Sequence, residues 1–286
     1  MKEGSILSRF ARHRPAVGSV VVIALLLLGA GFAGGLRLPD PIQIEMGHKF
    51  APPLTKGHVL GADELGRDVL SRLLHAGRIS LTVGVAAMLV TVTFGALVGT
   101  VAGYFRGAID TVLLRITDAM LSFPPIFLLL ALAAFVRPSL ASMTLIIGVT
   151  SWMDVTRMVR AQMLALRERE FVQGALGLGA SGGRIMLRHL LPNTVGIIAV
   201  AATLSVARAI LLESYISFLG YGIQPPLASW GNMLNNAQSY FASAPWVAIF
   251  PGIAITLAVT SFNFLGDGLR DAFDPRHVMR QRRGEG

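Results

Sequence analysis

The chain has 286 residues, of which 53% are hydrophobic and only 14% are charged, against roughly 25% charged residues in an average soluble domain. A soluble protein needs polar side chains to cover its surface, so this composition excludes a soluble globular protein. The net charge of +9 would suggest nucleic-acid binding in a soluble protein, but in a membrane protein it first indicates which side of the bilayer is basic. Because there is no cysteine, disulfides and thiolate metal sites are excluded.

Six apolar stretches are long enough to cross a bilayer as helices. The predicted spans are about 16–36, 80–104, 112–136, 140–156, 194–219 and 246–265. The third contains Pro124 and Pro125, which predict a kink because proline lacks a backbone donor. Arg137 and Pro138 separate the third span from the fourth, which predicts a tight helical hairpin. The sequence therefore predicts an all-α integral membrane fold with six transmembrane helices.

Residues 1–36 begin with basic side chains and continue into an apolar run that ends in small residues, as a signal peptide would. The run is longer than the 7–15 apolar residues typical of a signal peptide. Cleavage would also leave five spans, with the two ends of the chain on opposite sides. We therefore expect 1–36 to be a cytoplasmic tail followed by a retained first transmembrane helix.

Lysine and arginine are unevenly distributed among the segments that connect the predicted spans. With the N-terminus in the cytoplasm, 17 of the 25 basic residues fall inside and seven outside, while Arg208 lies within a span. Cytoplasmic connections of membrane proteins carry this excess, so we expect both termini to be cytoplasmic, with a tail at 269–286. The distribution also explains the net positive charge without a nucleic-acid partner.

The connection 37–79 is predicted to lie on the outer side of the membrane. From Asp63 to Leu74 apolar residues recur every three or four positions. This periodicity predicts an amphipathic helix that lies at the outer membrane surface before the second span.

No motif for covalent or nucleotide chemistry is present. There is no G-x-x-x-x-G-K-[S/T] phosphate loop, and no histidine falls within a predicted span to act as a base or metal ligand. His48, His58 and His75 share the outer connection, but their spacing matches no zinc motif, so we expect separate, solvated histidines. The sequence thus predicts a chain that is not an enzyme and binds no metal.

Asp118, Arg208 and Glu213 are ionisable residues that fall within predicted spans. Charged groups at membrane depth are costly and therefore face the bundle interior, a water-filled path or a partner. Arg208 and Glu213 are five residues apart on one helix and project about 140° apart, which makes them poor partners for each other. Two interpretations stay open: these residues line a translocation path, or they lock neighbouring helices together.

The segment LGYGIQPPLASWGNML, residues 219–234, follows the fifth span on the outer side. Its glycines, paired prolines and tryptophan predict an ordered, re-entrant loop with an anchor at the membrane interface. Gln224, Pro225 and Trp230 are candidates for an outer gate or for docking of an extracytoplasmic protein. A simple anchoring loop is the alternative.

The segment EFVQGALGLGASGGRIMLRHLLPN, residues 170–193, is basic and rich in small residues although apolar spans flank it. It predicts a short helix that ends near Gly177 or Gly179 and a second helix capped by Ser181. Pro192 fits the first turn of the next span. The glycines and alanines allow close approach of another backbone, so we expect a protein docking site on the cytoplasmic side.

This segment resembles the EAA loop of bacterial ABC-importer permeases, in which Glu-Ala-Ala is followed by a glycine, an isoleucine and a closing Leu-Pro. The corresponding positions are Gln173, Gly174, Ala175, Gly179, Ile185, Leu191 and Pro192. Glutamine stands where the pattern has glutamate, and glycine where it has the first alanine. HVLGADELGRDVLSRLLHAGRISLTVG, QPPLASWGNML, APWVAIFPGIAI and FNFLGDGLRDAFDPR are also similar, in order, to the C-type permease of the dipeptide, oligopeptide and nickel importers.

The resemblance implies a type I ABC importer permease fold, with five core helices in 80–268 and a coupling loop at 168–190. It implies a homologous B-type permease, two cytoplasmic ABC ATPases that bind ATP and Mg, and an extracytoplasmic solute-binding protein that docks on 37–79 and 219–245. The chain itself would bind no cofactor, and it would lie in the cytoplasmic membrane.

The function implied is import of small peptides by alternating access, driven by the ATPases. A nickel or other metal-chelate permease is the alternative within the family. A stand-alone secondary transporter is a more distant alternative, because it predicts an inverted repeat that the sequence does not clearly show.

Overall fold

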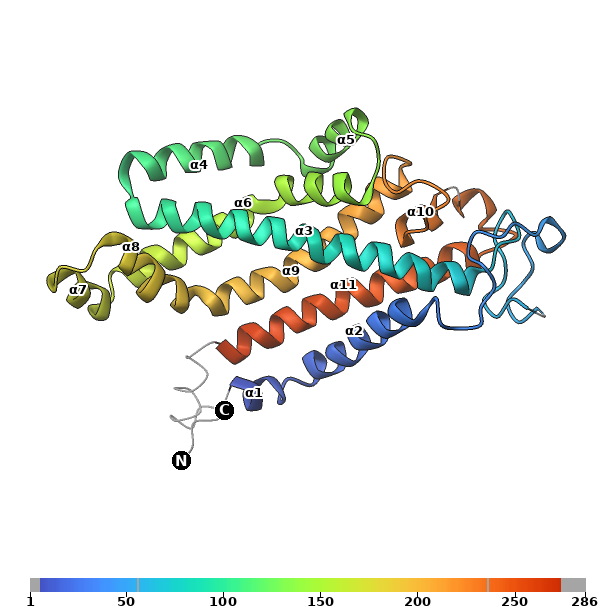
Figure 1. Cartoon of the computed structure of the whole chain (residues 1–286), viewed down its shortest axis with the longest axis horizontal. Coiled ribbons are helices and arrows are strands. Elements are labelled where there is room, and N and C mark those ends of the chain that lie inside the picture. Colours follow the sequence, from blue (N-terminus) through green and yellow to red (C-terminus); the bar gives the residue numbers. More distant parts are fainter. Residues whose placement is uncertain (1–5, 56, 236, 274–286) are drawn as a thin grey trace.

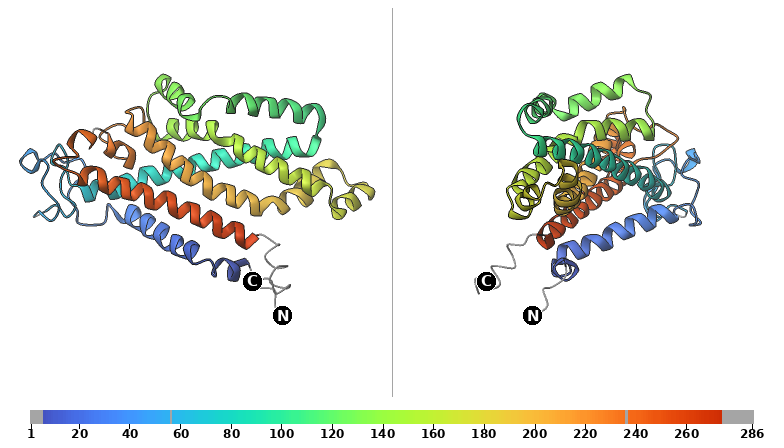
Figure 2. Two further views of the ribbon diagram at one scale, coloured as in Figure 1. Left: turned by 180° about the vertical axis from the view of Figure 1, so that it is seen from behind. Right: turned by 60° about the vertical axis from the view of Figure 1, so that its left-hand side comes forward.

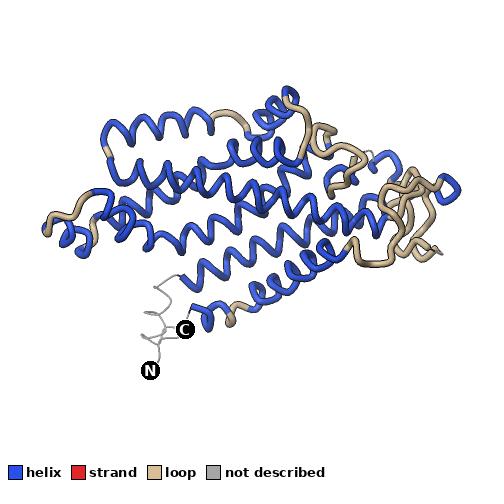
Figure 3. The backbone as a smooth tube through the Cα atoms, viewed as in Figure 1, coloured by secondary structure: helices blue, strands red, loops and turns tan. Residues whose placement is uncertain are grey.

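The computed structural model describes residues 6–55, 57–235 and 237–273, which form a bundle of long helices with no strand beyond isolated bridges (Figures 1 and 3). In chain order the α-helices are α1 Ile6–Phe10, α2 Arg14–Phe32, α3 Val69–Phe105, α4 Gly107–Leu121, α5 Pro125–Phe135, α6 Leu140–Arg167, α7 Glu170–Gly177, α8 Gly182–Arg184, α9 Leu191–Phe218, α10 Trp230–Leu234 and α11 Trp246–Phe273. Short 3₁₀ helices lie at η1 Met46–His48 and η3 Ala237–Tyr240, and a π-helix, η2 Ile185–Leu190, joins α8 to α9.

Within the described residues, four helical stretches are long and apolar enough to cross a membrane: α2, α3, the run 182–218 that ends with α9, and α11. α4 and α5 together would add a fifth. α6 has 28 residues but does not qualify by composition, because its second half carries several charged side chains. The all-α membrane fold is therefore confirmed, while the count of six transmembrane helices is not.

The predicted third span is interrupted rather than kinked. α4 and α5 meet at an angle of 83°, and the break contains Pro124. Pro125 begins α5, where its missing N–H leaves no hydrogen bond unmade. The proline pair thus ends one helix and starts another.

The predicted amphipathic helix over 63–74 is wrong. α3 begins at Val69 and continues without interruption to Phe105, so part of the predicted surface helix is the start of the second span. Asp68 fixes this start, because its Oδ1 accepts a hydrogen bond from the N–H of Ser71 at 2.7 Å. The apolar periodicity was real, but Val69 faces the hydrophobic core of the protein instead of the membrane surface.

α3 and α6 pack along a seam of glycines. Gly95, Gly99 and Gly103 recur at four-residue spacing on α3, and a Cβ at Gly99 would lie 2.7 Å from the carbonyl oxygen of Thr156 on α6. The Thr156 hydroxyl in turn donates to the Gly95 carbonyl oxygen at 3.1 Å. Such small residues let membrane helices approach closely, and the G-x-x-x-G spacing is the signal in the sequence that could have predicted this seam.

The long helices run roughly along one axis, so the bundle has two ends (Figures 1 and 2). α7 and α8 project at one end, toward which α1 and the C-terminal end of α11 also lie. The loops around 37–55 and 219–235 gather at the other end. The predicted tail at 269–286 begins within α11, which continues to Phe273; the rest of it lies outside the described residues.

Candidate functional site

Residues 170–190 form the predicted helix–turn–helix, which projects from one end of the bundle (Figures 1 and 2). α7 ends at Gly177, and Gly179 adopts φ +78°, a left-handed conformation that favours glycine. Ser181 precedes α8, but its side chain makes no capping hydrogen bond. The second helix is short and becomes π-helical at η2, and Pro192 lies in the first turn of α9 as predicted.

The seven residues expected to contact the ATPase differ in accessibility. Gln173, Gly174, Gly179 and Pro192 are exposed, and Ala175 and Leu191 are half-buried. Ile185 is fully buried and packs in an apolar cluster with Val172 of α7. Ile185 therefore holds the segment against the bundle and is not open to a partner.

Gln173 has a structural reason to be glutamine. Its Nε2 donates a hydrogen bond to the carbonyl oxygen of Arg167 at 2.9 Å, at the C-terminal end of α6. An ionised glutamate has no donor for this bond. The departure from the EAA pattern thus coincides with a contact that fixes α7 to α6.

The tip of the helix–turn–helix exposes large apolar side chains that the sequence analysis did not single out. Leu178 is 92% exposed, and Phe171, Leu176 and Leu187 are also exposed. Exposed apolar side chains are frequent at protein contacts. These residues make the tip a candidate docking surface.

Arg208 of α9 forms an ion pair with Asp154 of α6, and the two side chains are 43% and 51% exposed. Arg208 lies on the helical run 182–218, one of the four stretches in the described part of the chain that are long and apolar enough to cross a membrane. The pair borders a cavity of about 180 Å³ lined also by Thr91 and Ser151.

Asp118 is held by a charged partner on a neighbouring helix. Its Oδ1 lies 2.5 Å from the guanidinium of Arg157 on α6. One α-helical turn away from Arg157, Arg160 makes two hydrogen bonds of 2.6 Å to Asp110. Both pairs join α4 to α6, which is the arrangement expected of residues that lock helices together.

Glu213 lies at the centre of a buried polar network. Its carboxylate accepts hydrogen bonds from the hydroxyls of Ser80 at 3.2 Å and Ser217 at 2.6 Å. The Ser80 hydroxyl also accepts from the backbone N–H of Trp230 at 3.1 Å. The network joins α3, α9 and α10, so Glu213 is satisfied inside the chain.

Trp230 is not an anchor at the membrane interface, and that prediction is wrong. It is 2% exposed, and its indole Nε1 donates to the carbonyl oxygen of Leu73 at 3.0 Å. α10 folds back against α3, α9 and α11, so the tryptophan fills the hydrophobic core instead of meeting lipid.

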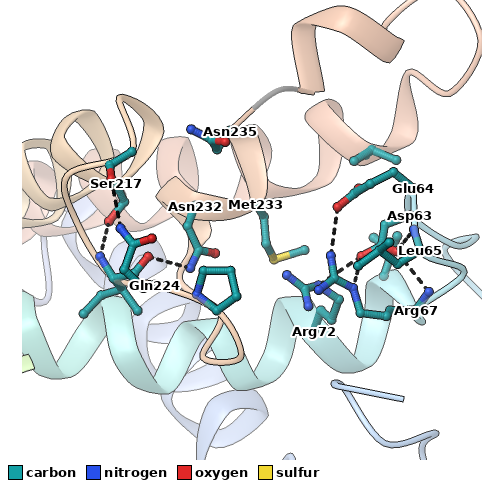
Figure 4. Close-up of a pocket in the computed structure, with 15 residues that line it drawn as sticks. Asp63, Glu64, Leu65, Arg67, Arg72, Ser217, Gln224, Asn232, Met233 and Asn235 are labelled. Carbon is teal, nitrogen blue, oxygen red and sulfur yellow. Dashed lines mark hydrogen bonds and ion pairs between the residues drawn. The ribbon is translucent and has the colours of Figure 1, made fainter. Parts of the chain in front are cut away.

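The loop before α3 and the loop between α9 and α10 meet around a cavity of about 260 Å³ (Figure 4). On one side Asp63 accepts hydrogen bonds from Arg67 at 2.7 Å and pairs with Arg72 at 3.3 Å. On the other side Gln224 and Pro225 line the cavity, and the Gln224 Nε2 donates to backbone carbonyls of its own loop. Of the three residues predicted for an outer gate, Gln224 and Pro225 line this cavity and Trp230 does not.

The fold and these sites define a multi-pass α-helical membrane protein with an exposed helix–turn–helix at one end and a charged pair between two of its long helices. Residues 95–278 match the family described as binding-protein-dependent transport system inner membrane component. The chain is 44% identical over 272 residues to the "Putative peptide permease protein" of Brucella ovis, covering 94% of this chain and 89% of that protein. It is 41% identical over 271 residues to the oligopeptide transport system permease protein OppC of Escherichia coli K12, covering 94% and 89%.

The dipeptide transport system permease protein DppC of Alkalihalophilus pseudofirmus is 38% identical over 265 residues, which cover 93% of this chain and 87% of that protein. The chain therefore belongs to the inner membrane components of binding-protein-dependent transport systems, in the family of the dipeptide and oligopeptide permeases. The resemblance found in the sequence is confirmed.

Proposed function

We propose that this chain is a permease subunit of an ATP-driven importer and forms half of the translocation path for small peptides. The observation that carries the proposal is the helix–turn–helix of residues 170–190, hereafter the coupling element, with Leu178 exposed at its tip. A membrane subunit without a phosphate-binding loop needs such a surface, on which an ATPase can bind and to which it can transmit its conformational change. The relatives named as peptide permeases support the substrate class.

In this proposal two ABC ATPases, which bind ATP and Mg, dock on the coupling elements of this chain and of a homologous B-type permease. The coupling element is then cytoplasmic, and so are both termini, because α1 and the end of α11 lie toward the same end of the bundle (Figure 1). An extracytoplasmic solute-binding protein docks at the opposite end, on the loops that surround the cavity in Figure 4. This chain itself binds no nucleotide.

The homologous permease would cover the face that carries Arg208 and Asp154. A charged pair at membrane depth must meet protein, water or substrate, because lipid solvates charge poorly. A peptide has a charged group at each end, so a path lined by one guanidinium and one carboxylate offers each end a partner of opposite charge. We therefore place the pair on the translocation path.

Motion of the coupling element would reach this pair through apolar packing. Val172 and Ile185 of the coupling element share a buried cluster with Val155 and Val159 of α6 and with Ala201 of α9. α6 carries Asp154 and α9 carries Arg208. ATP-driven closure of the ATPases would thus move both helices together and alternate access between the two sides of the membrane, as rocking bundles do.

The test is transport by the assembled complex in liposomes. We expect uptake of a labelled di- or oligopeptide that requires ATP, both ATPases and the loaded binding protein. Leu178→Asp should lower ATPase association and uptake about tenfold or more, the loss expected when a contact worth at least about 1.4 kcal/mol is removed. Leu54→Asp is the control for ATPase association alone, because Leu54 is 86% exposed in the loops at the opposite end, where the binding protein docks in this proposal.

Two results would contradict the proposal. Peptide uptake that persists without any ATPase would indicate a secondary transporter. ATP-dependent uptake of a nickel chelate in preference to every peptide tried would leave the ATPase coupling in place and overturn the substrate class.

A further inference from the structure

The loop between α2 and α3 brings together three residues that are separate in the sequence. Glu45 immediately precedes η1, His48 is the last residue of η1, and His58 lies in a turn further along the loop. Their candidate metal-ligand atoms all lie within 4.8 Å of one another, and the rings of His48 and His58 are 5.2 Å apart. His58 is only 4% exposed, so the expectation of separate, solvated histidines is wrong for this residue.

The carboxylate of Asp68 orients the imidazole ring of His58. The Nδ1 of His58 lies 3.0 Å from Oδ2 of Asp68, and the other oxygen of Asp68 caps α3 through the N–H of Ser71. With its proton on Nδ1, His58 presents the lone pair of Nε2 to the loop. The same carboxylate–histidine arrangement fixes the tautomer and the ring orientation of histidines that bind metals.

The backbone fixes Glu45 against the turn that precedes α3. The N–H of Glu45 donates to the carbonyl oxygen of Leu65 at 3.1 Å. A Cβ at Gly66 would lie 1.8 Å from the Glu45 carbonyl oxygen, so only glycine fits there. The Glu45 carboxylate accepts from Gln43 at 3.0 Å and lies 2.9 Å from Nδ1 of His48. These contacts hold Glu45 and His48, neither of which is buried, next to the buried His58.

We propose that Glu45, His48 and His58 bind a divalent cation, with Zn²⁺ preferred and water as a fourth ligand. Two imidazole nitrogens and one carboxylate oxygen are a donor set that zinc uses, at bond lengths of about 2.0–2.2 Å. Tetrahedral geometry then separates ligand atoms by about 3.3 Å, so the cluster must close by up to about 1.5 Å. Rotation of the side chains of Glu45 and His48 achieves this, because neither is buried.

A bound ion would join η1 to the turn at His58 and, through Asp68, to the first turn of α3. It would stiffen the loop at the end of the bundle where the cavity of Figure 4 lies. This inference does not depend on the transported substrate, since the ligands belong to one loop of this chain.

The test is zinc binding by the full chain, purified in detergent with its partner subunits, without a polyhistidine tag and after removal of metals with a chelator. Zn²⁺ is titrated in competition with a chromophoric chelator, and Co²⁺ absorption reports the coordination geometry. We expect one Zn²⁺ per chain, a four-coordinate Co²⁺ spectrum and a raised unfolding temperature with zinc. His48→Ala and Glu45→Gln should each weaken binding at least about tenfold, the lower limit for loss of an outer-shell partner of a metal site.

His75→Ala is the matched control. His75 lies on α3 near the same end, and its Nδ1 bonds the Ser71 carbonyl oxygen instead of joining the cluster. It should bind zinc like the unmodified chain. The proposal is overturned if the chain binds no Zn²⁺ at 100 μM, if His48→Ala binds as tightly as the unmodified chain, or if His75→Ala loses as much affinity as His48→Ala.

Discussion

Arg208 and Asp154 pair across α9 and α6 with both side chains partly exposed, whereas Glu213, further along α9, is completely buried. The two ionisable residues of one helix therefore meet different surroundings. Glu213 receives its hydrogen bonds from within the chain, as expected of a residue that locks helices. Arg208 and Asp154 stay partly open, and in the proposed assembly a partner subunit or a water-filled path would meet them.

Exchanging the two charges separates a role in transport from a role in folding. Arg208→Asp or Asp154→Arg alone should lower the unfolding temperature, because each substitution places two like charges next to each other. The double variant should recover most of the unfolding temperature, since an ion pair between α6 and α9 is restored. If the charges meet the peptide, its uptake should stay at least about tenfold lower, equivalent to about 1.4 kcal/mol. Uptake that recovers fully with stability would assign the pair to helix locking.

The control for this exchange is the pair between Arg157 and Asp118, which joins α6 to α4. Its side chains are about half exposed, and the pair lies outside the coupling element. The exchange Arg157→Asp with Asp118→Arg should leave uptake within about twofold, because exposed surface pairs contribute roughly 0–1 kcal/mol.

Gly179 tests the coupling element. Gly179→Arg should abolish stimulation of ATP hydrolysis by the loaded binding protein while the helices stay folded, because the long side chain blocks close docking of the ATPase. The position has φ +78°, and a Cβ there would meet no atom within 4 Å, so the backbone conformation alone adds about 1–2 kcal/mol of local strain for another residue. Gly179→Asn controls for this strain, since asparagine tolerates the left-handed region, and it should retain stimulation. Stimulated hydrolysis at the normal rate in Gly179→Arg would show that 170–190 is not the coupling surface.

Ser80 tests the buried network around Glu213. Ser80→Ala removes a donor to the Glu213 carboxylate and leaves the Trp230 N–H without its acceptor. An unsatisfied buried group costs about 1–3 kcal/mol, so the unfolding temperature should fall and the Trp230 amide should exchange hydrogen faster. Ser122→Ala is the control, because Ser122 is exposed at the end of α4 and bonds only locally. An unchanged amide exchange rate at Trp230 would mean that Ser80 does not hold α10.

The membrane fold and the helix–turn–helix followed from sequence because both rest on local patterns. Apolar runs locate the long helices, and the glycines around Gly179 mark the turn wherever the segment lies. The start of α3 could not be predicted in this way. An apolar period over 63–74 fits a surface helix and a buried helix start equally well, and only tertiary packing of Val69 decides between them.

Contacts between distant residues explain the remaining errors. Trp230 was expected at the membrane interface, but its partners Leu73 and Ser80 lie about 150 residues away. The partner of Arg208 proved to be Asp154, which the predicted fourth span already contained but which spacing alone could not pair. The exposed apolar tip at Leu178 is likewise invisible in a sequence where most residues are apolar, because exposure depends on the fold.

The glycine seam between α3 and α6 gives the last prediction. Gly99→Val places methyl groups where a single Cβ would already lie 2.7 Å from the Thr156 carbonyl oxygen and 2.9 Å from Val159. Because both neighbours belong to the packed face of α6, the helices must move apart, at a cost of about 1–3 kcal/mol. The unfolding temperature of the purified complex should fall accordingly. Gly18→Val, in an open position on α2 with no atom within 4 Å of a Cβ, should leave it nearly unchanged, and equal effects of the two substitutions would show that close packing at Gly99 does not stabilise the bundle.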